Sequence, residues 1–420
     1  MISEKSAQGA ERDIQDALVR ADAPQHIIAV LKLLQFGTPS TENLYRLDEG
    51  EWQKFLCWCD ARQLTMLLPY VCGGSLPPPI AENILDKTNR YAIRFERLKA
   101  SLFEITDAFQ AANLEFVLLK GLSHAPDMTP DALLRAQGDI DLWLRGSSVY
   151  EAAAVLRGLG YGSMRDSKSR HLGPMARPNT WRWQGDLFDP DMPISVELHY
   201  ELWSAKAEHV EVPQLDSFWA RRTVRDFAGH NIPVLCQEDL LGFAALHLLL
   251  HLLHGDLPLQ RAWEIAQFLE THADDDRFWN NWSTTHDSQL RQIEAAMYCL
   301  VGQWFGCRLS QSVSTEIFTL DDKLKAWLAD LWLAPLISQW RPNKREVWLH
   351  LTLVKTRKDQ VKILLRRLFP LSLPSGPQTL ISPTILIQHI RFLGSRFVRH
   401  LSTLAPTILD GLRLALLGRL

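Results

Sequence analysis

The sequence predicts an α+β fold, in which a small mixed sheet is embedded in helical N- and C-terminal regions. Three observations support this. Apolar residues recur every three to four positions up to about residue 110, which is typical of helices. Short apolar or alternating runs, typical of strands, follow between residues 114 and 200. Helical spacing returns after Pro233. Strands interleaved with one helix in the middle segment favour a compact mixed unit.

The 420 residues, of which 46% are hydrophobic, are enough for two or three domains with a large core. We expect four segments along the chain. They are a helical N-terminal region at residues 1–110, a mixed α+β core at 111–235, a helical domain at 236–340 and a basic helical region at 341–420.

Four short runs in the middle segment read as strands. They are LEFVLLKG at residues 114–121, DIDLWL at 139–144, TWRWQ at 180–184 and ISVELHY at 194–200. Between the second and the third of these runs, residues 147–162 have helical spacing, begin at a Ser cap and end at glycine.

The net charge of −3 is unevenly distributed. Residues 341–420 contain fourteen Lys or Arg and three acidic residues, a local charge of +11 that leaves −14 for the rest of the chain. These basic residues alternate with Trp and Leu at helical spacing, so a peripheral membrane contact is one expectation for this region. The alternative is an ordinary amphipathic helix on the acidic body. Nucleic-acid binding is less favoured, because the rest of the chain is acidic.

The chain is expected to be cytoplasmic. Its N-terminal stretch is polar and has no apolar segment of the secretory type. The longest apolar run, residues 240–253, is too short to span a membrane and contains two histidines. The six cysteines match no zinc spacing and are expected to be free thiols in a reducing compartment.

Two aspartates in the run DIDLWL are candidates for chemistry. In a strand, residues i and i+2 share one face, so Asp139 and Asp141 point the same way while Ile140 and Leu142 point into the core. Adjacent carboxylates repel each other, and partial burial increases the repulsion. A proton, a basic side chain or a divalent cation must offset it, and Mg²⁺ prefers such oxygen ligands.

A third carboxylate has the same setting, because Glu197 in ISVELHY shares its strand face with Ser195 and His199. Three carboxylates from neighbouring strands can hold two metals roughly 4 Å apart, as in-line nucleotidyl displacement requires. The alternative is that the paired aspartates are simply the solvent-facing side of an alternating strand. The upstream Lys120-Gly121 favours the metal site, since lysine supplies charge and glycine admits a phosphate.

These motifs together resemble a known family. The order VLLKGLSHA, Arg135, GDIDLWL, a helix ending LGYG, and ISVELHY is similar to the uncharacterised bacterial nucleotidyltransferase family of the polymerase-β superfamily. The resemblance covers about residues 51–269 and implies a polymerase-β-like nucleotidyltransferase core within residues 111–235. Departures are Ser123, one residue later than in the usual Gly-Ser pair, a Glu as third carboxylate, and Glu264 where the family more often has Asp.

The resemblance also implies roles for individual residues. Asp139, Asp141 and Glu197 would bind Mg²⁺ or Mn²⁺, with Glu197 near the attacking hydroxyl. His199 is the candidate general base. The residues implied for the nucleotide are Lys120, Gly121 and Ser123 at the triphosphate, Arg135 in contact with phosphate or bracing the aspartates, and Gly138 leaving room beside them.

Three further histidines, His247, His251 and His254, follow at i, i+4 and i+7 on one helical face. A zinc site, a role beside the substrate and plain packing are the alternatives, and the absence of a neighbouring Cys or HExxH pattern disfavours zinc. Arg261, on the next predicted helix, is a candidate contact for phosphate or acceptor.

The resemblance implies a Mg²⁺-dependent nucleotidyltransferase that moves an NMP, most simply AMP from ATP, onto an acceptor hydroxyl. The acceptor is left open among a small molecule, a glycan, a peptide and an RNA end. Two alternatives remain at this point: a non-catalytic scaffold that binds nucleotide or a partner, and kinase-like phosphoryl transfer by the same metal site.

Overall fold

The computed structural model describes residues 14–418, except residues 38, 165–169 and 369–382. Helices predominate, and seven strands form one mixed sheet, so the predicted α+β class is confirmed. The N-terminal stretch used for the localisation prediction lies largely outside the described residues. No helix among the described residues has both the length and the apolar character needed to cross a membrane.

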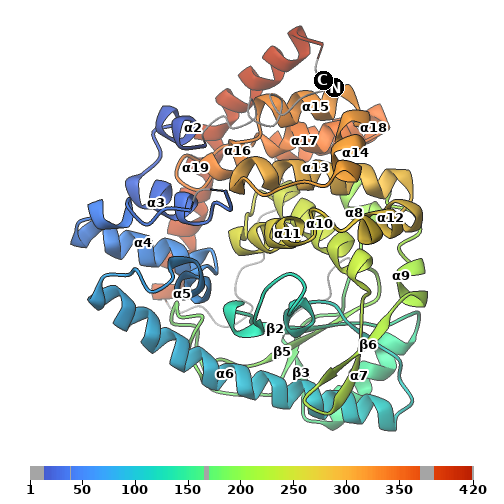
Figure 1. Cartoon of the computed structure of the whole chain (residues 1–420). Coiled ribbons are helices and arrows are strands. Elements are labelled where there is room, and N and C mark those ends of the chain that lie inside the picture. The colour runs from blue at the N-terminus through green and yellow to red at the C-terminus, as the bar shows by residue number, and fades with distance from the viewer. Residues whose placement is uncertain (1–13, 38, 165–169, 369–382, 419–420) are drawn as a thin grey trace.

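The N-terminal region is helical, as predicted. Its α-helices are α2 (Ile14–Arg20), α3 (Gln25–Leu33), α4 (Glu49–Ala61), α5 (Leu68–Cys72) and α6 (Pro78–Ala111). The predicted break at the Gly- and Pro-rich residues 73–79 is the gap between α5 and α6. The 34-residue helix α6 is amphipathic and runs along the whole lower edge of the molecule in Figure 1.

The sheet has the strand order β3-β4-β5-β2-β1-β7-β6. Its strands are β1 (Val117–Leu118), β2 (Asp139–Trp143), β3 (Gly162–Ser163), β4 (Met175–Ala176), β5 (Ser195–His199), β6 (Thr223–Phe227) and β7 (His230–Val234). The central pair β2 and β5 is parallel, as is β1 with β7, and the other pairs are antiparallel. Helix α7 (Ser148–Gly158) follows β2.

The two faces of the sheet have different coverings. Ile140 and Leu142 of β2 and Val196 and Leu198 of β5 form one hydrophobic cluster with α6 and α7. The opposite face carries the polar side chains of the same strands and Trp143, which belongs to the second, larger cluster. The alternation predicted for DIDLWL is therefore confirmed.

Helices cover this second face and make up the rest of the chain. Figure 1 shows α10 and α11 above the sheet, with α15, α17 and α18 farther from it. The α-helices after β5 are α8 (Ala205–Glu208), α9 (Ser217–Ala220), α10 (Gln237–Leu253), α11 (Leu259–Thr271), α12 (Asp276–Thr285), α13 (Ser288–Phe305), α14 (Gln311–Thr319), α15 (Asp322–Asp330), α16 (Ala334–Ile337), α17 (Glu346–Leu353), α18 (Arg357–Leu368) and α19 (Pro383–Leu416). The division into four segments stays a prediction.

Two local predictions are wrong. Residues 180–184 do not form a strand. Asn179 accepts a hydrogen bond from the backbone N–H of Trp181, and the indole of Trp181 donates to Asp189, so this segment turns instead of extending along the sheet. Ser147 occupies the N-cap position of α7, but its side chain makes no capping hydrogen bond, because its backbone is already in the helical region.

The hairpin β6–β7 was not predicted. Its strands are joined by Ala228 and Gly229, which have φ values of 53° and 90°. A two-residue turn with positive φ at both positions matches the twist of antiparallel strands. The flanking runs TVRDF and HNIPV have the alternation of strands, but the dipeptide Ala-Gly is a weaker sequence signal for a hairpin turn than the usual Asn-Gly.

Candidate active site

Two carboxylates face each other on the central strands. The parallel pairing places Asp141 of β2 opposite Glu197 of β5, and Asp139 opposite Ser195. Candidate ligand atoms of Asp141, Glu197 and His199 all lie within 4.8 Å of one another. Within the described part of the chain, this is the one group of three or more His, Cys, Asp or Glu side chains with metal-binding spacing. Three of the predicted site residues, Asp141, Glu197 and His199, therefore lie close together on the helix-covered face, and their roles stay predictions.

Asp141 is almost completely buried and has two partners on one oxygen. The ammonium of Lys120 and Nε2 of His199 each lie 2.8 Å from its Oδ1 atom. Burial opposes the charge on Asp141, but Lys120 and His199 outweigh it and hold the pKa of Asp141 well below its usual range. Asp141 is therefore a carboxylate at any physiological pH, with its charge partly balanced.

Asp139 differs from Asp141. It is half-buried, it is not part of the three-residue cluster, and no described residue forms a hydrogen bond or ion pair with it. Burial and the neighbouring Asp141 charge raise the pKa of Asp139. A cation bound beside Asp139 would offset both effects and favour the ionised carboxylate.

His199 is held as a neutral imidazole. Burial lowers its pKa to about 4, even though Asp141 favours the protonated form. With Nε2 donating to Asp141, His199 holds that carboxylate in place, in the way that histidines and carboxylates support one another around metal ions.

Two residues of the site were missed by the sequence analysis. Nε2 of His171 lies 3.6 Å from the carboxylate of Glu197, and its ring centroid lies 4.9 Å from that of His199. The neighbouring Arg170 is close enough to Asp141 and Glu197 for their charges to raise its pKa, although burial lowers it overall. Both residues precede the short strand β4 in a loop without periodicity, and no local pattern predicts their approach to β5.

The loop after β1 brings a glycine close to the site. Gly121 has a φ of +75°, and a Cβ at this position would lie 1.9 Å from Oε1 of Gln137. The positive φ favours glycine at this position, and any larger residue would also require the Gln137 side chain to move. Gly138 is different, because an added Cβ would meet only Met192, at 3.5 Å. Ser123 is buried, and its hydroxyl has no partner among the described residues. The phosphate-side roles of these three residues stay predictions.

The buried side chain of Arg135 links the segment before β2 to helix α11. Its guanidinium contacts the carboxylate of Glu264, which also lies 3.2 Å from Nδ1 of His124 and accepts from Gln260 at 2.6 Å. Burial opposes the charge on Glu264, but Arg135 and His124 lower its pKa to about 2. The charge of Arg135 is paired with Glu264, and the two roles predicted for Arg135, a phosphate contact and bracing of the aspartates, stay predictions.

The histidines of α10 divide into two groups. His247 and His251 both contact the guanidinium of Arg261, and their rings pack edge to face with centroids 4.7 Å apart. Burial lowers the pKa of both imidazoles, that of His251 to about 4. Burial lowers the pKa of Arg261, and the charges of Asp139 and Asp141 act to raise it, so Arg261 lies within electrostatic reach of the carboxylates. His254 instead contacts Glu208 at 3.1 Å.

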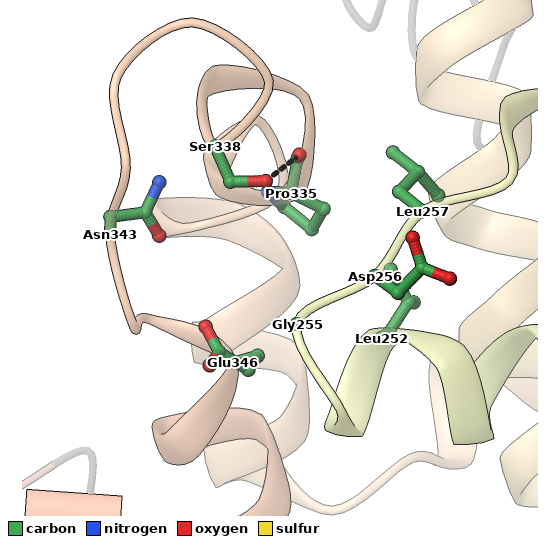
Figure 2. Close-up of a pocket in the computed structure, with 8 residues that line it drawn as sticks. All are labelled: Leu252, Gly255, Asp256, Leu257, Pro335, Ser338, Asn343 and Glu346. Atoms are coloured by element: carbon green, nitrogen blue, oxygen red, sulfur yellow. Dashed lines mark hydrogen bonds between the residues drawn. The ribbon is translucent and has the colours of Figure 1, made fainter. Parts of the chain in front are cut away.

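A small cavity next to these helices is too small for a substrate. Figure 2 shows it between the turn that follows α10 and the α16–α17 segment. Ser338 donates a hydrogen bond of 2.6 Å to the carbonyl of Pro335 at its edge. Its volume is about 10 Å³, which is room for one water molecule at most. It is lined by Leu252, Gly255, Asp256, Leu257, Pro335, Ser338, Asn343 and Glu346.

The mixed sheet, the facing carboxylates on its central strands and the surrounding Lys and Arg side chains define a class of protein: one with a phosphate-transfer type of site that suits a cation and an anionic substrate. Comparison with known families agrees. Residues 48–306 match the model of the uncharacterised nucleotidyltransferase family, and the chain belongs to that family. Membership supports a transferase with an NTP substrate. No curated protein and no solved structure is significantly similar to the chain.

Proposed function

We propose that this protein is a divalent-metal-dependent nucleotidyltransferase that moves an NMP, most simply AMP from ATP, onto an acceptor hydroxyl. The observation that carries the proposal is the register of β2 and β5, which sets Asp141 opposite Glu197 with Asp139 beside them on the same face. Family membership supports the same class of reaction. In this reaction the hydroxyl oxygen bonds to the α-phosphorus, the bond to the bridging oxygen breaks, and pyrophosphate leaves.

The donor set fits Mg²⁺ or Mn²⁺. Asp139, Asp141 and Glu197 supply hard oxygen ligands, and the raised pKa of Asp139 indicates a carboxylate that gains from a nearby cation. When bound, the cation would balance charge on the phosphates and lower the pKa of the attacking hydroxyl. We assign His199 to holding Asp141, because its Nε2 donates to that carboxylate and therefore already carries a proton.

The cationic side chains around the carboxylates are suited to the triphosphate. Lys120 reaches the site from the β1 side, and Arg261 reaches it from α11. Phosphate oxygens would give the Lys120 ammonium an alternative partner to Asp141. The guanidinium of Arg261 offers a phosphate several donors in one plane. Arg261 donates to the neutral imidazoles of His247 and His251, and these partners leave its charge available for an anion.

We further propose that the acceptor lies in a groove beside Asp139. The groove has a volume of about 510 Å³, which suits a small substrate, and Ser195, the strand partner of Asp139, is one of its lining residues. Its wall includes the exposed indole of Trp183 and the side chain of Arg182. An indole face beside polar donors suits a hydroxyl-bearing ring compound such as a sugar.

The nucleotide site can be tested by calorimetry with Mg²⁺ or Mn²⁺ and a panel of NTPs. We expect the wild type to bind an NTP only with metal, and Asp139→Asn/Asp141→Asn to lose this binding. Asp274→Asn/Asp276→Asn is the control, since it removes an exposed aspartate pair of the same spacing. Metal-independent binding, or binding that survives in the folded double variant, would favour the scaffold alternative.

The type of transfer and the groove need separate measurements. ATP labelled at the α-phosphate should label the acceptor, whereas label transfer from the γ-phosphate would indicate kinase-like chemistry. For the groove, Trp183→Ala should lower the binding affinity for neutral sugars and leave metal–NTP binding intact. Phe318→Ala, which removes an exposed aromatic ring on α14, is the matched control. Sugar binding that is equal in both variants would contradict the placement of the acceptor. The predicted membrane contact of the C-terminal region is independent of this chemistry.

A further inference from the structure

The last helix, α19, exposes most of the large apolar side chains that the structure describes from Phe397 onward. Its large hydrophobic side chains are between 41% and 88% exposed at Phe397, Leu401, Ile408, Leu409, Leu412 and Leu416. Most of them are spaced by four or seven residues, so they share one side of the helix. A helix that packs on a protein core normally turns this side inward. Here the apolar side faces outward, and an exposed apolar stripe of this length marks an interaction surface.

The inward side of the described part of α19 carries small residues together with Leu414, and it is fixed in place. Thr403, Thr407 and Gly411 are buried there, one turn apart. A Cβ on Gly411 would lie 2.1 Å from the ring of Trp348 in α17, so the two helices approach as closely as glycine allows. The adjacent Asp410 accepts a hydrogen bond of 2.6 Å from Arg345. The helix therefore cannot roll to bury its apolar side without losing these contacts.

Positive charge accompanies the apolar surface. Helix α18 leads to α19, and the imidazole of His400 lies 3.0 Å from the carbonyl oxygen of Leu368, so the end of α18 lies against α19. Exposed basic residues of α18 are interspersed with the half-exposed Val361 and Leu365. They are Arg357, Lys358, Lys362 and Arg366.

We propose that the outward side of α19, together with the basic surface of α18, binds an anionic lipid bilayer, with the helix lying in the plane of the interface. Apolar residues beside Lys and Arg are the combination that such helices use. A second copy of the chain is the competing occupant. It is disfavoured because a symmetric contact would bring two regions of charge +11 together.

Flotation of the full-length protein with lipid vesicles tests the inference. We expect binding to mixed phosphatidylcholine–phosphatidylglycerol vesicles, weaker binding at high salt and little binding to pure phosphatidylcholine. Leu409→Glu/Leu412→Glu should reduce the binding about tenfold or more, because two leucine side chains no longer enter the interface. Both positions are exposed, so the fold should tolerate the change. Leu85→Glu/Phe318→Glu, which alters two exposed apolar residues elsewhere, should bind as the wild type does.

Other outcomes would overturn the inference. Absence of binding to the anionic vesicles would do so, as would binding that Leu409→Glu/Leu412→Glu leaves unchanged. Light scattering of the lipid-free protein tests whether a second copy of the chain occupies this surface instead of lipid. A dimer that dissociates in the same double variant would show that α19 mediates self-association instead.

Discussion

Lys120 and Asp141 form an ion pair at the centre of the candidate site, with 2.8 Å between the ammonium nitrogen and Oδ1 of the carboxylate. The same oxygen accepts from His199. A positive charge therefore already lies against the carboxylate that we assign to the metal. Lys120 and a divalent cation would compete for Asp141, whereas Lys120 and a triphosphate would attract each other.

This competition predicts opposite effects of Lys120→Met on two ligands. Without nucleotide, Mn²⁺ should bind more tightly, by about tenfold if one ion pair worth about 1.4 kcal/mol is removed. The affinity for the metal–NTP complex should fall, since a phosphate contact is lost. Titration with Mn²⁺ alone and then with Mn²⁺ and ATP measures both. Lys120→Arg, which keeps the charge, is the control, and weaker Mn²⁺ binding in Lys120→Met would contradict the competition.

Asp139→Asn should lower the affinity for metal and NTP without lowering the stability of the fold. The substitution removes a carboxylate whose pKa is raised by burial and by Asp141, so repulsion in the folded state decreases. We expect a Tm no lower than that of the wild type, together with a loss of at least tenfold in metal–NTP affinity. Thermal unfolding with and without Mg²⁺ and ATP provides both values. A clear fall in Tm would mean that Asp139 is needed for folding and not for ligands.

The pair formed by Arg135 and Glu264 should contribute strongly to stability. Glu264→Gln would leave the Arg135 guanidinium buried without its counter-charge, which typically costs about 3–5 kcal/mol of unfolding free energy. Glu115→Gln removes an exposed carboxylate paired with Arg222 and should cost about 0–1 kcal/mol. Urea unfolding of both variants measures the difference. Equal costs would show that the buried pair has no special role.

A buried histidine should make stability depend on pH. His286 lies 3.1 Å from Asp239 and 2.9 Å from Glu294, and these carboxylates outweigh burial and raise its pKa from 6.5 to about 9. Because the folded pKa is the higher one, the stabilisation is complete below pH 6.5 and is lost as the pH rises through 9. It amounts to on the order of 3 kcal/mol.

Urea unfolding across pH 6–10 tests this linkage. The free energy of unfolding of the wild type should decline over the window between the two pKa values. In His286→Gln the decline should be smaller, although the variant is less stable at every pH. Parallel profiles for the two proteins would exclude His286 as the titrating group.

The sequence predicted the elements in which local pattern and burial agree. Alternation in DIDLWL and ISVELHY gave β2 and β5, because one face of each strand packs on α6 and α7. The run TWRWQ also alternates, but the backbone N–H of Trp181 donates to the Asn179 side chain and its indole donates to Asp189, and the run does not join the sheet. The hairpin β6–β7 was missed because its turn lacks a strong dipeptide signal.

The candidate site was predicted in part. The i, i+2 spacing and the strand pairing account for Asp139, Asp141, Glu197 and His199 on one face. The approach of His171 depends on a loop whose path only the tertiary structure determines. The contact between Lys120 and Asp141 could not be read from spacing either, because a lysine side chain reaches several partners from one backbone position.

The buried side chain of Arg94, on α6, hydrogen-bonds to the residues that precede both central strands. It donates to the carbonyls of Met192 and Pro193 before β5 and, at 3.1 Å, to that of Gly138 before β2. The strands come from segments more than fifty residues apart, yet one guanidinium aligns their first residues. The carboxylates are thus set in register when the chain folds, and a ligand that arrives later meets a preorganised site, so little of its binding energy is consumed in ordering the backbone.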